Sequence, residues 1–221
     1  MFYEAGKPHG LPRDPFKSCI VPRPIGWLTT LDADGTVNLA PFSFFNGVAS
    51  DPPMVVAGIN GAPQPAGMKD TLANCRATEE FVFNMATWEL RDAMNLTSAS
   101  VPAGVDELAL AGLTTVPARL VKPPRVAESP IHLECRVHEI VELPCTLPGS
   151  RNTIIIGRVL GIHIDDDALT DGIVDIARIR PIARLGYMDY AVVESVFSMP
   201  RPSAEAALDA GAGRAKATGP E

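Results

Sequence analysis

The chain has 221 residues, a formal net charge of -7 and 46% hydrophobic residues. This length is enough for one domain with a sizeable core, whereas an acidic chain without a basic stripe does not suit the phosphate backbone of a nucleic acid. The first residues lack the charged and apolar regions of a signal peptide, and no apolar run has the length of a membrane span. We therefore expect a soluble, cytoplasmic protein with no nucleic-acid or membrane partner.

A hairpin is the first regular structure that the sequence predicts. Residues 1–17 are rich in Pro, Gly and charge and are expected to form an extended arm that can pack on a partner. Ile25 to Leu31 then has the apolar, Thr-rich pattern of a buried strand, Asp32 to Gly35 has turn chemistry, and Val37 to Leu39 resumes the strand. The hairpin delivers residues 40–46 to one fixed place in the fold.

Further strands and helices are predicted from apolar spacing. Met54 to Ile59 is a short apolar run after a double proline, which predicts a central strand. Asp70 can cap a helix that runs from Thr71 to about Thr78. The pattern next predicts a strand over 81–85 and a helix over 88–99.

Two long strands dominate the second half of the chain. Residues 131–143 alternate in polarity, and residues 153–164 are nearly all apolar. They follow a Pro-interrupted crossing segment over 101–124, in which residues 106–110 form one short helical stretch. Antiparallel strands joined into a small barrel account for both strand patterns.

The domain organisation follows from these elements. We expect an N-terminal arm over 1–17 and one barrel domain with flanking helices over 18–200. Residues 201–221 are rich in Ala, Gly and charge and have little to bury, so we expect a flexible tail.

The cysteines and histidines do not form a metal-binding pattern. Because no Cys-x-x-Cys occurs, we expect reduced, scattered thiols rather than a disulfide framework or a zinc site; the thiols are Cys19, Cys75, Cys135 and Cys145. The His132-x-Glu134 run has the pattern of a zinc deaminase, but Pro144-Cys145 lacks the second cysteine. The alternation instead places His132 and Glu134 on one face of a strand, which we expect to be solvated or dimer-facing.

The segment after the hairpin combines three phenylalanines with small polar residues. This mixture suits the face and edge of a flat, partly polar heterocycle, so it favours a ring-binding loop; the residues are Pro41, Phe42, Ser43, Phe44, Phe45 and Asn46. The alternative is that the three phenylalanines fill the core, as aromatic residues beside a strand usually do. Composition alone favours that alternative.

The block from Pro22 to Pro53 resembles the signature of the flavin reductase-like, FMN-binding split-barrel family. The motifs that carry the resemblance are Pro-Arg-Pro-Ile, Asn-Leu-Ala-Pro-Phe-Ser-Phe-Phe-Asn and Ser-Asp-Pro-Pro, followed by Lys69-Asp70-Thr71-Leu72, Glu80 to Asn84, Thr153 to Val159 and Arg184-Leu185-Gly186. The likeness covers roughly Pro12 to Val193. It implies a mainly β fold, an antiparallel split barrel of Greek-key type that binds FMN.

The resemblance also implies a set of cofactor contacts. It assigns the isoalloxazine and the ribityl chain to Pro41, Phe42, Ser43, Phe44 and Asn46. Ser50, in the Ser-Asp-Pro-Pro motif, can donate to ribityl or phosphate oxygens. Lys69 and Thr71 are the expected phosphate ligands, a cation and a hydroxyl at a helix N-terminus. A solvated Lys69 and a capping Thr71 are the alternatives.

Three further residues have candidate roles. Arg23 lies between two prolines that fix its backbone, so its guanidinium is pre-oriented for a phosphate or a partner-chain carboxylate, with solvent as the alternative. Trp27 is expected in the core rather than at the flavin edge. His163 is the candidate catalytic residue, a proton donor to reduced flavin, although a satisfied structural histidine accounts better for its place at a strand end.

Two departures from the family pattern affect the expected activity. Flavin reductases of two-component monooxygenases commonly have Gly-Asp-His before the Thr-Ile-x-Ile-Gly strand, and Asn152 stands here where that histidine would be. Tyr187 replaces the second glycine of Arg-Leu-Gly-Gly, and a ring there can narrow the substrate side of the flavin. Both changes favour the branch that resembles flavoredoxin and the reductase component of nitrilotriacetate monooxygenase.

The predicted function is an oxidoreductase that carries electrons from NADH or NADPH through FMN to free flavin, a monooxygenase partner or another acceptor. We expect a homodimer, because the family usually builds its flavin site near a subunit interface. One alternative is a flavoredoxin-like electron-transfer protein that a protein partner reduces. Another is a flavin-free binding module that kept the barrel.

Overall fold

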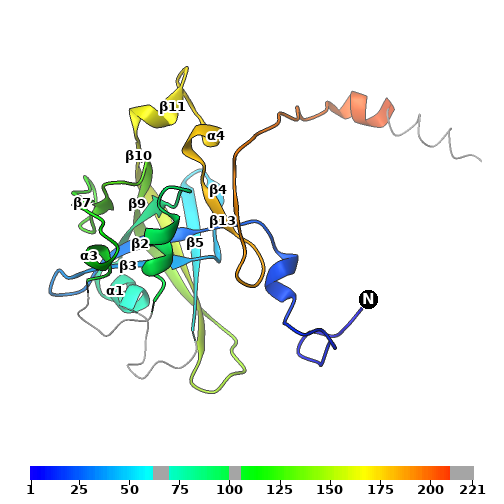
Figure 1. Cartoon of the computed structure of the whole chain (residues 1–221), viewed down its shortest axis with the longest axis horizontal. Helices are drawn as coiled ribbons and strands as arrows, with labels where there is room; N and C mark the ends of the chain where they lie inside the picture. Colours follow the sequence, from blue (N-terminus) through cyan, green and yellow to red (C-terminus); the bar gives the residue numbers. More distant parts are fainter. Residues whose placement is uncertain (62–69, 100–105, 210–221) are drawn as a thin grey trace, which may run out of the picture.

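The computed structural model describes residues 1–61, 70–99 and 106–209. An antiparallel seven-stranded sheet forms the body, in the order β3-β2-β6-β9-β10-β5-β4 (Figure 1). Its strands are β2 (Gly26–Leu31), β3 (Val37–Phe42), β4 (Phe45–Ser50), β5 (Pro53–Gly61), β6 (Glu80–Met85), β9 (Ile131–Leu143) and β10 (Arg151–Ile164). The mainly β fold predicted from the sequence is confirmed.

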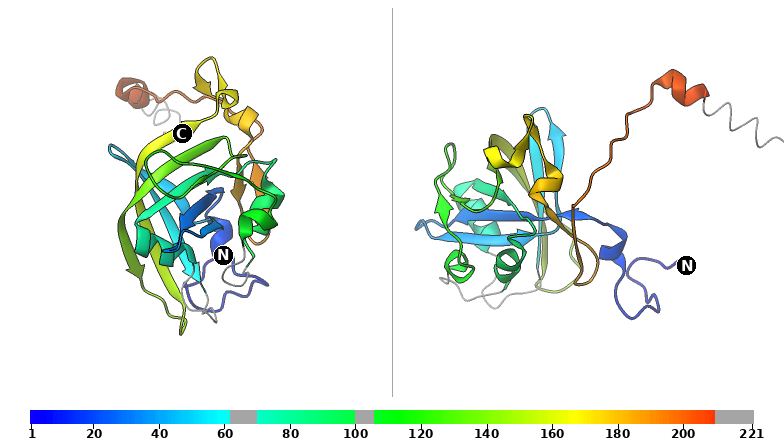
Figure 2. Two further views of the ribbon diagram at one scale, coloured as in Figure 1. Left: turned by 90° about the vertical axis from the view of Figure 1, so that its left-hand side faces the viewer. Right: turned by 45° about the horizontal axis from the view of Figure 1, so that its top comes forward.

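The sheet curls until its two edge strands meet. β3 and β4 lie at opposite ends of the strand order, yet only Ser43 and Phe44 separate them in the chain. A connection of three Cα steps spans at most roughly 11 Å. The end of β3 and the start of β4 must therefore lie close together, and Figure 2 shows the sheet curving round. No ladder of hydrogen bonds joins β3 to β4, both of which are fully described, so the barrel is split along this seam.

Aromatic side chains fill the barrel interior. Phe45 stacks on Phe83 with the ring centroids 4.8 Å apart and the planes 4° from parallel. Gly26 makes room for this pair, because a Cβ built on it would lie 2.5 Å from Cδ2 of Phe45. Fully burying a phenylalanine contributes roughly 1.5–3 kcal/mol, so this close approach is one reason for glycine at position 26.

A second core lies outside the barrel, beneath the short helices. It contains Trp27, which is fully buried as expected and donates from Nε1 to Thr97 Oγ1 at 2.9 Å. The helices are α1 (Asp70–Thr78), α2 (Arg91–Leu96), α3 (Glu107–Leu110) and α4 (Ile176–Ile179), with 3-10 turns η1 (Phe16–Cys19) and η2 (Asp166–Ala168). The helix expected over 88–99 is thus shorter. None of the helices in the described ranges could cross a membrane.

Short strands attach loops to the barrel. β1 (Arg23–Pro24) pairs with β13 (Ile182–Arg184), which pairs with β14 (Tyr190–Val192). The other two-stranded sheets are β7 (Thr115–Val116) with β8 (Arg125–Val126), and β11 (Leu169–Thr170) with β12 (Ile173–Val174). The sheet with β1 matters for the site, because it holds the turn after β13 close to the N-terminal η1.

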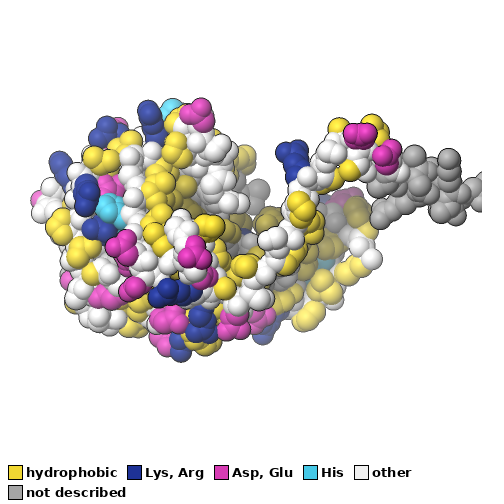
Figure 3. Space-filling model, turned by 90° about the horizontal axis from the view of Figure 1, so that it is seen from above, with side chains coloured by type: hydrophobic (Ala, Val, Ile, Leu, Met, Phe, Trp, Pro, Cys, Tyr) yellow, Lys and Arg dark blue, Asp and Glu magenta, His cyan; other side chains and the backbone are white. Residues whose placement is uncertain are grey.

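The ends of the described chain extend from the barrel. After β14 the chain runs outward, and Figure 3 shows this segment standing away from the body. Phe197 is 84% exposed on it, and residues 204–209 are helical. The flexible tail predicted over 201–221 therefore begins with a helical turn, and its residues 210–221 lie outside the described ranges.

Candidate cofactor-binding site

A cavity of about 870 Å³ lies at the seam of the barrel. The connection between β3 and β4 contributes Ser43 and Phe44, and β4 contributes Asn46. The remaining walls come from η1, β1, β5 and the adjoining ends of β9 and β10; they include Lys17, Arg23, Val56, Asn60, Leu143, Asn152 and Ile154. This volume falls within the range of roughly 300–1,000 Å³ that is usual for small-molecule and cofactor sites.

Phe44 is fixed against β5 by a backbone contact. The Gly58 N–H donates to the Phe44 carbonyl at 2.7 Å, and a Cβ on Gly58 would lie 2.8 Å from the Phe44 Cβ. Any larger residue at position 58 would push the connection away from the strand. The sequence Ala57-Gly58-Ile59 therefore shapes the cavity as well as the core.

Arg23 supports the same wall from beneath. Its side chain is only 5% exposed, and its terminal nitrogens donate to the carbonyls of Lys17, Ile20 and Leu185. The Cζ atom lies 5.8 Å from the Phe44 ring centroid. Burial, with a smaller contribution from the Arg184 charge, lowers the pKa of Arg23 below its ordinary value, and an arginine stays protonated.

These contacts correct the expectation for Arg23. The solvent alternative is wrong because the side chain is buried. The two terminal nitrogens bind carbonyls of the chain itself instead of an open phosphate or a carboxylate. Only Nε has no partner among the described residues. Arg23 thus acts first as the residue that ties η1 and the turn after β13 to the cavity.

The structure divides the predicted loop residues into two groups. Arg23, Ser43, Phe44 and Asn46 line the cavity together, and Pro41 lines a smaller cavity beside it. Phe42 does not line it, because its side chain belongs to the barrel core, so the core-filling alternative is correct for this ring. Phe45 belongs to the same core and also forms part of the cavity wall.

Ser50 also lies apart from the cavity. It pairs with Pro53 at the exposed end of the hairpin between β4 and β5. Asn46 and Ser50 stand at opposite ends of β4, roughly 13 Å apart along an extended strand. The predicted hydrogen bond from Ser50 to the cofactor therefore has no support from its position.

The predicted phosphate ligands are placed only in part. Lys69 lies outside the described residues. Thr71 is 1% exposed, and its hydroxyl accepts a hydrogen bond from Asn38 Nδ2 at 2.9 Å. Asn74 donates to Thr30 beside it at 3.0 Å. The Thr71 side chain thus belongs to a buried polar network between α1, β2 and β3, a position that does not support its predicted role as a phosphate ligand.

His163 lies at the opposite end of β10 from the cavity residue Asn152. Its Nε2 contacts the carboxylate of Glu134, which also accepts hydrogen bonds from the N–H groups of Arg119 at 2.8 Å and Leu120 at 2.6 Å. Burial opposes the charge on Glu134, but these donors hold the pKa of its carboxyl below the usual value. His163 thus lies away from the cavity and bonds within the fold, as the structural alternative expects, and its catalytic role stays a prediction that this position does not support.

His132 and Glu134 are buried, so the expected solvated or dimer-facing surface is wrong. The chain from Arg119 to Val126 covers this face of β9: it binds Glu134 as described, and the Val126 carbonyl lies 2.8 Å from His132 Nε2. Burial lowers the pKa of His132 to about 4.

The four cysteines are all free thiols, and none of them lines the cavity.

Some cavity residues were not predicted as site residues. Lys17 belongs to the segment predicted as an extended arm, and Asn60 lies at the end of a strand with no distinctive motif. Asn152 had a signal, its departure from the family histidine. Its Nδ2 donates to the Pro144 carbonyl at 3.0 Å, so the amide has a fixed place in the cavity wall.

Comparison with known proteins identifies the relatives of this chain. Residues 18–190 match the model of the flavin reductase like domain. An uncharacterized protein of Halalkalibacterium halodurans is 36% identical over 185 residues, which are 83% of this chain and 88% of that protein.

Two solved structures are similar to the fold. Nitrilotriacetate monooxygenase component B from Bacillus cereus is 29% identical with a TM-score of 0.77, covering 83% of this chain and 90% of its own. Flavoredoxin of Desulfovibrio vulgaris has a TM-score of 0.72 at 21% identity, covering 93% of this chain and 100% of its own. The split-barrel fold indicated by the sequence is thereby confirmed, and both structures carry names from the branch that the sequence resembles.

Proposed function

Because the chain belongs to the flavin reductase like domain family, we propose that it is an FMN-dependent oxidoreductase. In this proposal it takes electrons from NADH or NADPH and passes them to free flavin, a monooxygenase partner or another acceptor. The observation that carries it is the cavity at the barrel seam, where four of the residues predicted for FMN binding come together.

The cavity wall fits the chemistry of FMN. Phe44, Val56 and Ile154 offer apolar surface for a planar ring system. Three amides, Asn46, Asn60 and Asn152, lie along the same wall and can bond the polar ring edge and the ribityl hydroxyls. The Asn46 Oδ1 accepts from the Gly47 N–H at 2.9 Å, which leaves its NH₂ group as a donor toward a ligand.

The anionic end of FMN is matched by charge. Lys17 lines the cavity as an exposed cation that can reach an anionic group, whereas Arg23 adds positive charge to the wall with its terminal nitrogens already bonded to carbonyls. No carboxylate side chain is among the lining residues that the structure describes. Flavin supplies the hydride and electron chemistry itself when bound. The protein residues therefore have the tasks of holding the ring against Phe44, keeping water from one face and leaving an approach for a second molecule.

A homodimer is part of this proposal. β4 forms an open edge of the sheet, and its residues from Asn46 to Ser50 are exposed, with Val48 55% exposed. An unpaired strand edge of this kind favours association with another chain. A second copy against β4 would cover the Asn46 side of the cavity. The free thiols suit the reducing cytoplasm that we propose as its location.

A flavoredoxin-like electron carrier is the second candidate. Asn152 supports it, because an amide bonded to Pro144 occupies the position where nicotinamide-dependent relatives are expected to have histidine. An amide does not titrate near neutral pH and so cannot act as a general acid or base there, as a histidine can. In this version a protein partner reduces the flavin, and nicotinamide reacts slowly.

The deciding experiment is an anaerobic absorbance titration of the FMN-loaded protein with NADH and then NADPH. Rapid bleaching of the oxidised flavin band is expected for the reductase. A band that persists until dithionite is added would favour the electron carrier instead. A protein that does not take up FMN would exclude both.

A further inference from the structure

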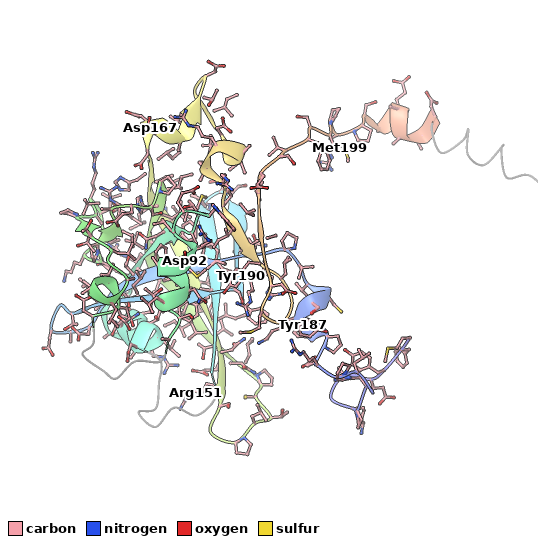
Figure 4. All side chains as sticks on the ribbon, viewed as in Figure 1. Asp92, Arg151, Asp167, Tyr187, Tyr190 and Met199 are labelled. Atoms are coloured by element: carbon pink, nitrogen blue, oxygen red, sulfur yellow. The ribbon has the colours of Figure 1, made fainter. Side chains whose placement is uncertain are left out.

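A second cavity adjoins the candidate cofactor cavity. It has a volume of about 300 Å³ and shares the side chains of Lys17, Arg23 and Ser43 with the larger one. Its outer wall is the turn between β13 and β14, which contributes Arg184, Tyr187, Met188 and Tyr190. Figure 4 shows Tyr187 beside η1 and Tyr190 nearer the α2 side marked by Asp92. We call this space the tyrosine chamber.

Arg184 organises the turn that forms the chamber wall. Its guanidinium contacts the Tyr190 hydroxyl and the Tyr187 carbonyl, and its Cζ lies 4.5 Å from the Tyr190 ring centroid. Backbone bonds of 2.9 Å from Leu185 N–H to Asp189 and from Asp189 N–H to Gly186 close the turn. The two tyrosines and the arginine are therefore held as one unit.

Tyr187 occupies a backbone conformation that suits glycine. Its φ is +53°, in the left-handed region that bulky residues rarely adopt. The related motif has its second glycine here, so this chain carries an aromatic ring at a position where the backbone favours none. Strain of this kind points to a role for the side chain. The ring is 42% exposed and faces the chamber that it lines.

The chamber is positively charged without a counter-charge. Lys17, Arg23 and Arg184 line it, and none of them forms an ion pair with the described residues. Arg23 is buried, with 5% of its surface exposed, and its Nε has no hydrogen-bond partner among the described residues. A chain of net charge -7 thus gathers three unpaired cations around one small space. Only Arg23 is buried, whereas Lys17 is exposed and Arg184 half-buried, and cations gathered without an opposite charge favour an anionic ligand.

We propose that the tyrosine chamber binds a small aromatic carboxylate beside the flavin. Arg184, a cation that lines the chamber and not the cofactor cavity, matches the carboxylate, and the Tyr187 and Tyr190 side chains offer aromatic surface for a ring. The volume of about 300 Å³ suits one small ring compound and is too small for a dinucleotide. This substrate class rests on the proposed function, because it places the ligand next to the cofactor cavity.

The test is isothermal titration of the full-length protein, FMN-free and FMN-loaded, with benzoate as the probe and benzamide as its uncharged match. Benzoate is expected to bind about tenfold more tightly than benzamide, as for the loss of a charged hydrogen bond. Tyr187→Gly removes the ring, and glycine adopts the positive φ of this position without strain. Benzoate is expected to bind this variant about tenfold more weakly. Arg184→Gln should weaken it by at least as much. Arg136→Gln, an exposed cation on β9, should leave it unchanged.

Several results would overturn the proposal. The first two are equal binding of benzoate and benzamide, and unchanged benzoate affinity in Tyr187→Gly. The third is displacement of benzoate by inorganic phosphate at equal concentration. The fourth is displacement of FMN by benzoate, which would assign the cations to the cofactor phosphate. FMN loading is read separately from flavin absorbance. A protein that binds benzoate through Tyr187 and Arg184 but takes up no FMN would support the chamber and refute the proposed function.

Discussion

The Glu134 carboxylate on β9 accepts its hydrogen bonds from His163 and from the N–H groups of Arg119 and Leu120, all within the side of the barrel remote from the cavity. Two backbone donors and one imidazole thereby share one buried carboxylate. This arrangement fastens the crossing segment before β8 onto the outer face of the barrel, where the same segment also covers His132.

Glu134→Gln is expected to lower the free energy of unfolding by roughly 1–3 kcal/mol, because an amide cannot satisfy all three donors and leaves a buried one unpaired. Urea unfolding at neutral pH measures this change. The exposed Glu139→Gln on the same strand is the control and should be nearly neutral. Equal effects of the two substitutions would contradict the fastening role.

His132 should make stability fall as the pH is lowered from about 6.5 to about 4. The unfolded chain binds a proton in this window, whereas burial keeps the folded imidazole neutral because its pKa is about 4. Because the pKa of His132 is lower in the folded state than in the unfolded chain, its contribution to stability is present above pH 6.5 and is lost as the pH falls to about 4. The loss amounts to about 3 kcal/mol in total. His132→Gln should flatten this part of the urea-derived stability profile. The exposed His138→Gln should not, and a profile unchanged by His132→Gln would refute the assignment.

Gly26→Ala tests the packing of the barrel interior. The added methyl group would meet the Phe45 ring at 2.5 Å and disturb its stack on Phe83. Overpacking of this kind costs roughly 1–3 kcal/mol, which thermal or urea unfolding will detect. Gly47→Ala is the matched control on an exposed strand, because its new Cβ would have no neighbour nearer than 4.0 Å. A similar loss in both variants would mean that the backbone, and not the Phe45 contact, is responsible.

Phe44→Ala should weaken FMN binding about tenfold, since it removes the aromatic wall of the cavity while the Gly58 contact to the Phe44 backbone remains. Quenching of flavin fluorescence on binding gives the affinity. Phe197→Ala, on the exposed C-terminal segment, should have no effect. Full FMN affinity in Phe44→Ala would remove this ring from the site.

The long strands could be predicted from the sequence because their patterns are local. The strand expected over 131–143 matches β9 at both ends, and the strand over 153–164 begins two residues late relative to β10. β4 was not predicted as a strand. Its positions after Phe45 are all exposed, so it has no apolar alternation, and it is a strand only through its pairing with β5.

The candidate site shows the same division between local and long-range information. The motif around Ser43 and Phe44 placed the cavity in the correct part of the chain, because a hairpin fixes where its end lies. The burial of His132 and Glu134 could not be predicted. Their strand pattern gives a shared face, but the segment that covers this face comes from Arg119 to Val126, and no periodicity in β9 encodes it.

The short link of Ser43 and Phe44 gives the barrel an unusual dependence on chain continuity. Because β3 and β4 share no hydrogen-bond ladder, their ends are held together by this link and by its bond to Gly58 of β5. An insertion there would loosen the seam and displace Phe44 from the cavity wall, while the same insertion in the exposed turn at Asp32 to Gly35 would be tolerated. The same two residues therefore join the barrel's edge strands and form part of the cavity wall, so a change in the length of this link would alter both.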